Sequence, residues 1–571
     1  MHSYVPLTPV TFLERSGKAF PQRDALIHAG RIVSFGELLH RARCLTQALM
    51  RLKVTHGDKV ALLTENNLPT VEAHFAIPGI GATIVMLNPW LSAADILDLL
   101  NYCEAKVLIA DAALFQKISS SWPIGLNHMP QLVLIGQPAE GYADKILDYE
   151  ICLGKEDGSF LLDRVVKSEL DPIAINFTSG TTGRPKGVTY SHRAAYLHAL
   201  GQVLMAGLTK KSKYLWVLPM FHVNGWGHMW ANVAVGCTQI IPVTNAIQGR
   251  EADFINRVRQ YGITHLSGAP RLVRLLAETP GPKDAFRDLT IVTGGAAPSP
   301  ALVQRLEEIG VNLIHQYGLN ETCGPYVVCE EQDEWRALPV EVRATMRARQ
   351  GIATIHAGTG LRVVDSDGHD VPSDGRTLGE VVMTGNTVAT GYYRNPEATE
   401  KAFRDGWFHS GDMAVVHADG YLEIRDRMKD LIYVETEYSW ENISSIEIEN
   451  ILCRNGAIQD AAVIGVLMEA RAKESPLLVA FVELKDGKQI SEEEIRSYCG
   501  DELSAYKRPQ VVYFTKLPKT STGKVRKDLL SKEALSRLAA PETPSMPGHK
   551  FCKKINQAGS VACSANHRRI F

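Results

Sequence analysis

The residues that most directly suggest chemistry lie in one short segment, residues 178–187, which is rich in small and hydroxyl side chains. Its three glycines and four Ser or Thr residues let the backbone fold around a ligand and present N–H and O–H donors, while Lys186 adds positive charge. Such a loop suits a polyphosphate. It is not a P-loop of the Walker A type, because no Ser or Thr directly follows the lysine. A flexible surface turn is the alternative interpretation.

Three other segments carry groups that could belong to the same site. Glu321 offers a carboxylate, the hard oxygen ligand that Mg²⁺ prefers beside substrate phosphates. Residues 294–298, Gly-Gly-Ala-Ala-Pro, permit close approach of the backbone to a ligand. Lys524 lies in a second glycine-containing loop. Each has an ordinary structural alternative: a solvated loop carboxylate, a strand-to-helix turn and a solvated lysine.

The elements expected around these residues alternate between strands and helices. Residues 173–177 are predicted to form a buried strand that leads into the loop 178–187, and residues 188–191 a second strand. From about residue 10 to residue 420, β-branched runs alternate with longer helical stretches, which is typical of layered α/β folds with largely parallel strands. Residues 425–430 form a charge-rich hinge candidate.

Beyond this hinge candidate the pattern changes. The sequence predicts a small α+β unit from residues 443–452, 460–466, 477–484 and 492–498. From about residue 541 the chain is polar, contains prolines and is basic, which predicts disorder. We therefore expect an N-terminal domain over residues 1–426, a small C-terminal domain over residues 427–537 and a disordered basic tail over residues 538–571.

The bulk properties exclude several classes of protein. A chain of 571 residues is too long for one compact core, and 45% apolar with 22% charged residues is the composition of a soluble globular protein. A net charge of -2 gives no reason to expect nucleic acid or an anionic membrane as partner. No apolar run is long enough to span a bilayer. The ten cysteines are scattered, which argues against zinc and against a disulfide framework.

The same features predict where the protein works. Scattered cysteines fit a reducing, intracellular setting, and residues 1–20 lack the continuous apolar core of a signal peptide. We expect the cytoplasm. The peroxisome stays open as an alternative, although the last three residues, Arg-Ile-Phe, are not a signal of the Ser-Lys-Leu type.

Residues 178–187 resemble the phosphate loop of the adenylate-forming superfamily, which contains acyl-CoA synthetases, adenylation domains of nonribosomal peptide synthetases and firefly luciferases. The resemblance extends to about Arg537. It implies a large domain of layered sheets and helices with a small mobile domain. It also implies an enzyme that uses ATP and Mg²⁺ to convert a carboxylic acid into an acyl-adenylate. Transfer of the acyl group to the thiol of coenzyme A would complete the reaction of an acid–thiol ligase.

The resemblance assigns roles to residues around the nucleotide. It implies that Tyr317 lies against adenine, that Asp412 binds the ribose hydroxyls and that Arg427 contacts the nucleotide. Glu321 and Thr178 would hold the magnesium ion. Asn320 replaces the threonine that is usual in the family. The full set expected to bind the nucleotide is Thr178, Ser179, Gly180, Thr181, Thr182, Gly183, Lys186, Gly295, Ala296, Gln316, Tyr317, Gly318, Asn320, Asp412, Arg427 and Lys524.

Three residues are expected to take part in catalysis. Residues 517–526 are similar to the last core motif of the family, whose lysine enters the adenylation site, and Lys524 is that lysine. It would bridge the carboxylate of the acid and the α-phosphate. Lys186 and His222 complete the catalytic set, and Lys429 occupies the hinge position about which the small domain swings.

Residues 218–230 are the most informative for the choice of acid. His222 resembles the gate histidine at the mouth of the acyl pocket of acyl-CoA synthetases. The Asn-Gly-Trp-Gly that follows, with residues 349–351, looks like the branch that activates short- and medium-chain aliphatic or aryl-substituted acids. Trp226 and Trp230 are bulky enough to shorten a pocket. The expected substrate-pocket residues are His222, Asn224, Trp226, Gly295 and Gly318.

Two segments of the small domain depart from the family pattern. Residues 433–440 lengthen a connection that is usually a short Ser-Gly-Gly turn and that approaches the pantetheine tunnel, and residues 471–476 replace a usual Trp-Gly-Glu-x-Pro. Three alternatives follow: a complete acid–CoA ligase, an adenylate-forming enzyme with an acceptor other than CoA, and a catalytically impaired nucleotide-binding homologue. No Gly-Gly-x-Ser carrier motif follows Lys524, which favours a free-standing ligase.

Overall fold

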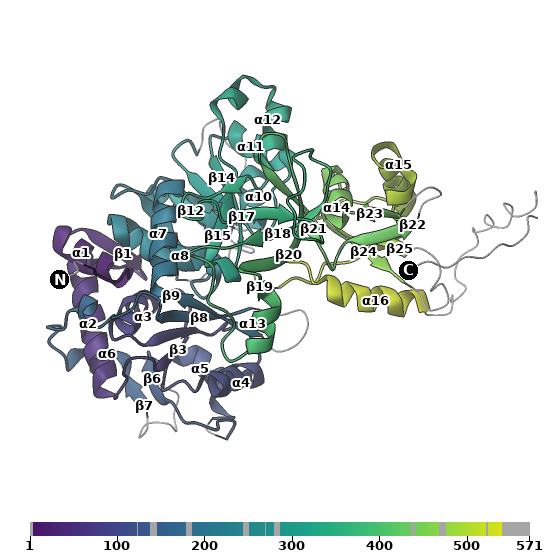
Figure 1. Cartoon of the computed structure of the whole chain (residues 1–571). Coiled ribbons are helices and arrows are strands. Elements are labelled where there is room, and N and C mark those ends of the chain that lie inside the picture. Colours follow the sequence, from purple (N-terminus) through teal and green to yellow (C-terminus); the bar gives the residue numbers. More distant parts are fainter. Residues whose placement is uncertain are drawn as a thin grey trace, which may run out of the picture.

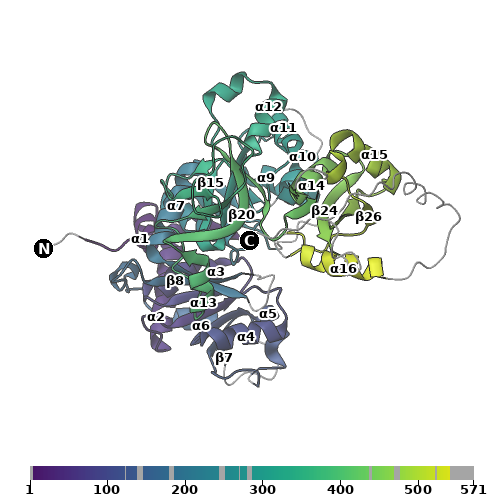
Figure 2. The ribbon, with the colours of Figure 1, turned by 45° about the vertical axis from the view of Figure 1, so that its right-hand side comes forward.

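The computed structural model describes residues 4–122, 124–137, 146–178, 185–243, 251–268, 270–278, 286–435, 440–467, 476–520 and 524–539. Within them, the chain forms a large body that ends with strand β21 (Leu422–Arg427) and a smaller body that begins with strand β22 (Ile432–Glu435) (Figure 1). Figure 2 shows the two bodies beside each other after a turn of the molecule. This arrangement confirms the predicted fold class.

The first sheet of the large body has seven strands in the order β7-β6-β5-β3-β4-β8-β9. Along β3, Val60 and Leu62 face one hydrophobic core, whereas Ala61 and Leu63 face another. Both faces of the sheet are therefore buried, which explains why its strands are apolar throughout. The strands are β3 (Lys59–Leu63), β4 (Thr83–Met86), β5 (Val107–Asp111), β6 (Gln131–Ile135), β7 (Ile146–Asp148), β8 (Pro172–Thr178) and β9 (Lys186–Ser191).

Four helices connect strands of this sheet along the chain: α3 (Leu68–Gly79), α4 (Ala93–Cys103), α5 (Ala112–Ser119) and α6 (Tyr149–Gly154). Helix α2 (Phe35–Arg51) leads into it from β2 of the second sheet. The pair β8 and β9 is antiparallel and confirms the two strands predicted on either side of the glycine-rich loop.

The second sheet has nine strands in the order β16-β15-β14-β13-β12-β10-β11-β1-β2. Helices α1 (Val10–Ala19), α7 (His192–Ala206) and α8 (Val223–Val235) share one core with both sheets. Helices α9 (Glu251–Tyr261), α10 (Pro270–Glu278), α11 (Pro300–Glu308) and α12 (Val340–Arg347) contribute to a second core with this sheet. The strands are β1 (Asp24–His28), β2 (Arg31–Ser34), β10 (Lys213–Leu215), β11 (Thr238–Ile241), β12 (His265–Gly268), β13 (Thr290–Thr293), β14 (Asn312–Leu319), β15 (Gly324–Val328) and β16 (Ile352–Ala353).

The third sheet of the large body is antiparallel. It contains β17 (Leu361–Val364), β18 (Gly379–Met383), β19 (Phe403–Arg404), β20 (Trp407–Val416) and β21. This sheet departs from the largely parallel pattern expected as far as about residue 420. The connections from β19 to β20 and from β20 to β21 are short turns, whereas parallel neighbours need a crossover of about a dozen residues, so these strands pair antiparallel. The short helix α13 (Pro396–Ala402) precedes β19.

The smaller body is an α+β unit, as the sequence predicts. A hairpin of β22 and β23 (Trp440–Ile443) precedes a three-stranded sheet of β24 (Ile458–Val466), β25 (Leu477–Leu484) and β26 (Val511–Phe514). Helices α14 (Ser445–Arg454), α15 (Glu492–Glu502) and α16 (Lys527–Ala539) complete it. The predicted tail, residues 538–571, lies outside the described residues except for its first two, which end α16.

The two bodies have separate hydrophobic cores. The two clusters of the smaller body draw their buried members from Ile432 to Ala534. The clusters of the large body contain no buried member beyond Leu422. Each body therefore packs against itself.

Candidate active site

The loop expected to bind phosphate connects the ends of two antiparallel strands. Thr178 ends β8 opposite Lys186, which begins β9, and its hydroxyl donates a hydrogen bond to the Lys186 carbonyl oxygen at 3.4 Å. Gly187 is needed on β9, because a Cβ atom there would lie 2.8 Å from Cγ2 of Ile175. The predicted residues Ser179, Gly180, Thr181, Thr182 and Gly183 lie outside the described residues.

Lys186 and Glu321 lie on either side of one tyrosine that the sequence analysis did not single out. Nζ of Lys186 lies 4.8 Å from the ring centroid of Tyr392, and the hydroxyl of Tyr392 donates a 2.8 Å hydrogen bond to Oε1 of Glu321. Burial and the Glu321 charge raise the pKa of Tyr392, so the phenol stays a donor. Tyr392 follows β9 by about 200 residues in the chain, and no spacing rule links the two.

Tyr317, Asp412 and Arg427 form a second group. Asp412 lies opposite Arg427 in the pairing of β20 with β21, and its Oδ1 is 3.2 Å from Nε of Arg427. Its Oδ2 accepts a 2.7 Å hydrogen bond from the hydroxyl of Tyr317 on β14. The Asp412 carboxylate, only 4% exposed, raises the pKa of Arg427. Burial, with the same carboxylate, raises the pKa of Tyr317.

Lys524 reaches this group from the smaller body. Its loop is held by two hydrogen bonds, from the Thr520 N–H to the Lys524 carbonyl oxygen at 2.7 Å and from the Lys524 N–H to Oγ1 of Thr520 at 3.1 Å. Lys524 is exposed to solvent. Partial desolvation by the surrounding protein and the positive charge of Arg427 nevertheless lower the pKa of Lys524. The carboxylates of Asp412 and Glu321 act in the opposite direction. Lys524 of the smaller body thus lies within electrostatic range of charged groups of the large body.

His222 lies directly before helix α8 and is half-buried. Burial and the positive charge of Lys524 lower the pKa of His222 from 6.5 to about 4. The imidazole is therefore neutral near pH 7. The side chains of Asn224 and Trp226, which the sequence analysis also assigned to the acyl pocket, lie outside the described part of the chain.

A pocket lies between α8 and the strands β12 to β15. Gly295 and Gly318, both predicted for the acyl pocket, line it, and so does Gln316, which was expected to contact the nucleotide. Gly318 has no room for a side chain, because a Cβ atom would lie 2.1 Å from the Gly324 carbonyl oxygen. Of the remaining lining residues, Leu218, His228 and Gly294 belong to segments that the sequence analysis singled out. No motif indicated the others, which are Ser267, Gly268, Val292, Thr293 and Pro325.

Other predicted residues surround this pocket or lie apart from it. Ala296 is exposed in the turn between β13 and α11, and Asn320 begins a short 3-10 helix, η2 (Asn320–Thr322), after β14. Trp230, expected to shorten the acyl pocket, is fully buried in the main core and donates a hydrogen bond to the carbonyl of His74 at 3.3 Å. It is absent from the lining of the described pocket.

The hinge candidate and the longer connection follow each other in the chain. Lys429 is exposed in the turn between β21 and β22. The longer connection forms the β22–β23 hairpin, in which Tyr433 is 48% exposed; residues 436–439 at its tip lie outside the described residues. The second departure, residues 471–476, is described only at Pro476.

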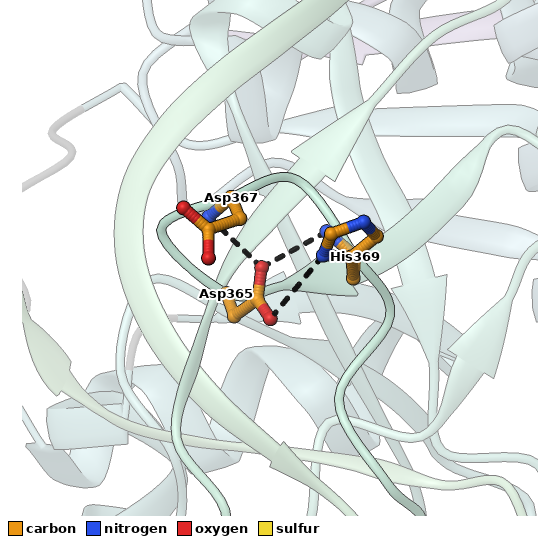
Figure 3. Close-up of side chains that lie close together, drawn as sticks. All are labelled: Asp365, Asp367 and His369. Carbon is orange, nitrogen blue, oxygen red and sulfur yellow. Dashed lines mark hydrogen bonds and ion pairs between the residues drawn. The ribbon is translucent and has the colours of Figure 1, made fainter.

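A separate cluster of possible metal ligands occurs at Asp365, Asp367 and His369 in the turn between β17 and β18 (Figure 3). All three are exposed. Oδ1 of Asp365 accepts hydrogen bonds from the backbone N–H groups of Asp367 and His369, each at 2.9 Å. An aspartate that accepts backbone hydrogen bonds in this way is usual in tight turns, so we assign no metal site here.

Comparison with known proteins places these observations among related chains. Residues 13–393 match the family model described as AMP-binding enzyme, and residues 447–524 match that of the AMP-binding enzyme C-terminal domain. An acetate–CoA ligase from Humulus lupulus is 38% identical over 93% of this chain and 95% of its own. A 4-hydroxybutyrate–CoA ligase from Metallosphaera sedula is 36% identical over 94% of this chain and 96% of its own. The solved structure of an anthranilate–CoA ligase in complex with anthranoyl-AMP superposes with a TM-score of 0.81 at 25% identity. The match covers 94% of this chain and 99% of the other.

Proposed function

The chain belongs to the family of AMP-binding enzymes, and we propose that it joins a short- or medium-chain aliphatic acid or an aryl-substituted acid to coenzyme A. It is an ATP-dependent acid–CoA ligase, like relatives that match it over nearly their whole length. The range of acids is inferred from those relatives, because one is named for acetate, one for 4-hydroxybutyrate, and the similar solved structure contains an anthranoyl-adenylate.

One observation carries the proposal for the site. Lys524, from the smaller body, experiences the charges of Glu321, Asp412 and Arg427. A cation brought from a separate body to a cluster of nucleotide-binding groups is what the adenylation step requires. We assign the domains to residues 1–426 and 427–537, so that the boundary falls at Arg427, the last residue of β21.

The first half-reaction forms the acyl-adenylate. A carboxylate oxygen of the acid attacks the α-phosphorus of ATP, and the bond from that phosphorus to the bridging oxygen of pyrophosphate breaks. Lys524 and Lys186 stabilise the negative charge that develops on the phosphate oxygens. Asp412 accepts hydrogen bonds from the ribose hydroxyls, while Tyr317 and Arg427 fix the carboxylate of Asp412. The charge of bound ATP favours the protonated form of Lys524 and offsets its lowered pKa.

Magnesium fits the residues at the phosphate end. Glu321 directs one carboxylate oxygen to Tyr392, and its second oxygen receives no hydrogen bond from a described residue. Glu321 would therefore hold Mg²⁺ through that oxygen, with the hydroxyl of Thr178 and phosphate oxygens as further ligands. When bound, the ion supplies charge neutralisation for the departing pyrophosphate.

The second half-reaction transfers the acyl group. The sulfur of coenzyme A attacks the acyl carbon, the bond to AMP breaks and the thiol proton is released. For this step we propose that the small domain turns about Lys429 and withdraws Lys524. Because His222 is neutral, it leaves no second positive charge at the gate of the acyl pocket.

The β22–β23 hairpin motivates the second candidate, an adenylate-forming enzyme with another acceptor. Its exposed Tyr433 lies where the family connection is shorter. The test follows acid-dependent pyrophosphate release and CoA-thioester formation side by side on the purified protein. Both signals together are expected. Pyrophosphate release without thioester formation favours the other acceptor, and the absence of both signals would contradict the ligase assignment.

We propose an intracellular location, with the cytoplasm favoured, because ATP and coenzyme A are available there. All eight cysteines among the described residues are free thiols, which suits a reducing compartment. Within the same residues, no helix combines the length and apolarity that a bilayer crossing demands. Fractionation of cells that carry the tagged full chain tests the proposal, and enrichment in peroxisomes would contradict the cytoplasmic assignment.

A further inference from the structure

The acyl pocket contains a buried amide without a partner. Gln316 lines the pocket and is 1% exposed, yet neither the oxygen nor the nitrogen of its side-chain amide is hydrogen-bonded to a described residue. A buried polar group in this state costs about 1–3 kcal/mol, and most such groups in native proteins are paired. The amide of Gln316 therefore lacks a hydrogen-bond partner within the described protein, and a bound ligand can supply one.

Other polar groups share the same pocket. His228 and Ser267 line it, both are buried, and Nε2 of His228 lies 3.5 Å from Oγ of Ser267. Only Leu218, Val292 and Pro325 give the described pocket apolar side chains of appreciable size. A pocket built for a plain alkyl chain would be lined mainly by such residues.

A second polar layer lies behind the lining. His198 is fully enclosed between Gly227 and Gly324, where Cβ atoms would lie 2.2 Å and 2.6 Å from its ring. Nδ1 of His198 and Oε1 of Gln202 have no hydrogen-bond partner among the described residues. Gly227 adjoins His228 and Gly324 adjoins Pro325 in the chain, so this layer supports the pocket wall directly. Buried polar side chains, His198 and Gln202, thus lie behind the lining of the pocket as well as in it.

We propose that the preferred acid carries a hydrogen-bonding substituent, a hydroxyl or carbonyl oxygen, on its acyl chain, and that the amide of Gln316 recognises it. The amide can both donate and accept, so it suits either substituent. The inference rests on the proposed ligase function and narrows its substrate class. A site built to bind a substrate oxygen rejects the analogue that lacks it, because the buried amide is then left unpaired.

The test compares pairs of acids that differ by one oxygen at similar size. Suitable pairs are 3-hydroxybutanoate with 3-methylbutanoate, 4-hydroxybutanoate with pentanoate, and 4-oxopentanoate with 4-methylpentanoate. The kcat/KM for pyrophosphate release is measured for each acid. In at least one pair we expect the oxygenated acid to exceed its alkyl partner by about tenfold or more.

Two variants then separate recognition from shape. Gln316→Leu keeps a similar volume without the amide, and it is expected to reduce the ratio within the preferred pair to about one. Gln304→Leu, on helix α11 outside the pocket, is the matched control and is expected to keep the wild-type ratio. Thermal melting of both variants checks that they are folded.

The outcomes distinguish this inference from the function on which it rests. If alkyl acids equal or exceed their oxygenated partners in every pair, the inference is wrong while the ligase assignment stands. If Gln316→Leu lowers both members of a pair equally, Gln316 shapes the pocket or contacts the nucleotide and does not recognise the substituent. Absence of pyrophosphate release with every acid would overturn the ligase assignment itself.

Discussion

Lys524 is proposed to serve a single half-reaction, with its charge acting where ATP and acid meet. It lies on a loop of the smaller body that is held through Thr520. We expect Lys524→Ala to slow pyrophosphate release by about 10²- to 10³-fold, the usual loss when a group that stabilises developing charge is removed. Thioester formation from supplied acyl-adenylate should be largely retained, because that step does not need the lysine.

The control for this experiment is Lys532→Ala on helix α16. Lys532 is exposed, and its removal alters the net charge of the smaller body in the same way. It is expected to leave both half-reactions near their wild-type rates. If Lys524→Ala slowed pyrophosphate release and thioester formation equally, the role assigned to Lys524 would be contradicted.

His222 offers a prediction about pH. Burial disfavours the imidazolium, and the charge of Lys524 disfavours it further, so the pKa of His222 is lowered from 6.5 to about 4. The ring should therefore stay neutral from about pH 8 down to about pH 5. Titration of the histidine resonances by NMR measures this, and Lys524→Gln should move the midpoint of His222 upward. A midpoint near 6.5 in the wild-type protein would refute the prediction.

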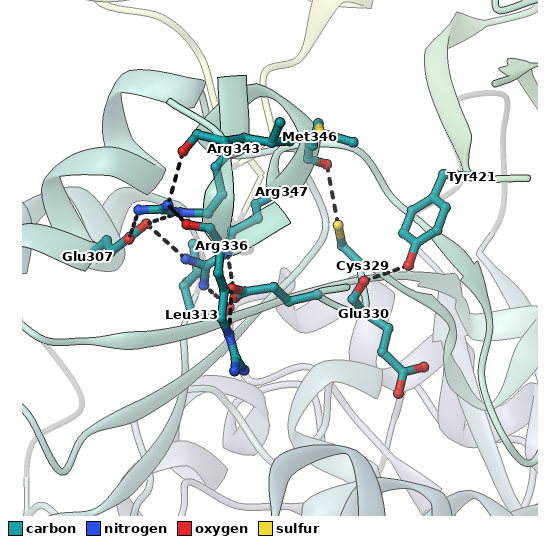
Figure 4. Close-up of polar contacts among 11 residues, drawn as sticks. Glu307, Leu313, Cys329, Glu330, Arg336, Arg343, Met346, Arg347 and Tyr421 are labelled. Carbon is teal, nitrogen blue, oxygen red and sulfur yellow. Dashed lines mark hydrogen bonds and ion pairs between the residues drawn. The ribbon is translucent and has the colours of Figure 1, made fainter. Parts of the chain in front are cut away.

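At the scale of elements, helices α11 and α12 are joined to the second sheet by a charged network (Figure 4). Glu307 accepts hydrogen bonds from Arg343 and from Nη1 of Arg347, the latter at 3.2 Å, and Nη2 of Arg347 donates to the Leu313 carbonyl on β14 at 3.2 Å. Glu307 thus pairs with two largely buried guanidinium groups, and Nε of Arg347 also lies 3.5 Å from a carboxylate oxygen of Glu331.

Neutralising that carboxylate should destabilise the large body. We expect Glu307→Gln to lower the free energy of unfolding by about 1–2 kcal/mol, because Arg343 loses its charged acceptor and Arg347 keeps only Glu331, while Glu307 itself has some solvent contact. Glu308→Gln on the same helix breaks only an exposed pair with Arg305 and should change stability by less than about 0.5 kcal/mol. Denaturation of the two variants in urea makes the comparison; equal stabilities would refute it.

Local pattern predicted the elements well where local forces decide them. The strands around the phosphate loop are confirmed as β8 and β9, because continuous apolar runs next to glycine-rich turns have few alternatives. The fold class and the enzyme class were also predicted, through resemblance. The partners of the site were not: Tyr392 meets Glu321, and His228 meets Ser267, only through tertiary packing of distant segments. Their contacts depend on strand order, which no motif encodes.

At the scale of the whole molecule, we propose that the short turn at Lys429, between β21 and β22, is the connection that bends. We expect Lys429→Pro to slow thioester formation by about tenfold or more, because proline fixes φ and restricts the preceding residue. Pyrophosphate release should change little, because under this proposal that step needs no movement of the small domain. Lys429→Ala removes the same side chain without this constraint. Equal slowing in both variants would attribute the effect to the lost side chain.

The separate cores of the two bodies have a consequence for heating. Because no buried member is shared between them, each body can melt in its own cooperative unit, and a single melting temperature would average two events. Calorimetry should resolve two transitions, and ATP should shift chiefly that of the body to which it binds. Warming could then abolish turnover while nucleotide affinity survives, so heat-inactivated enzyme would still sequester its substrate.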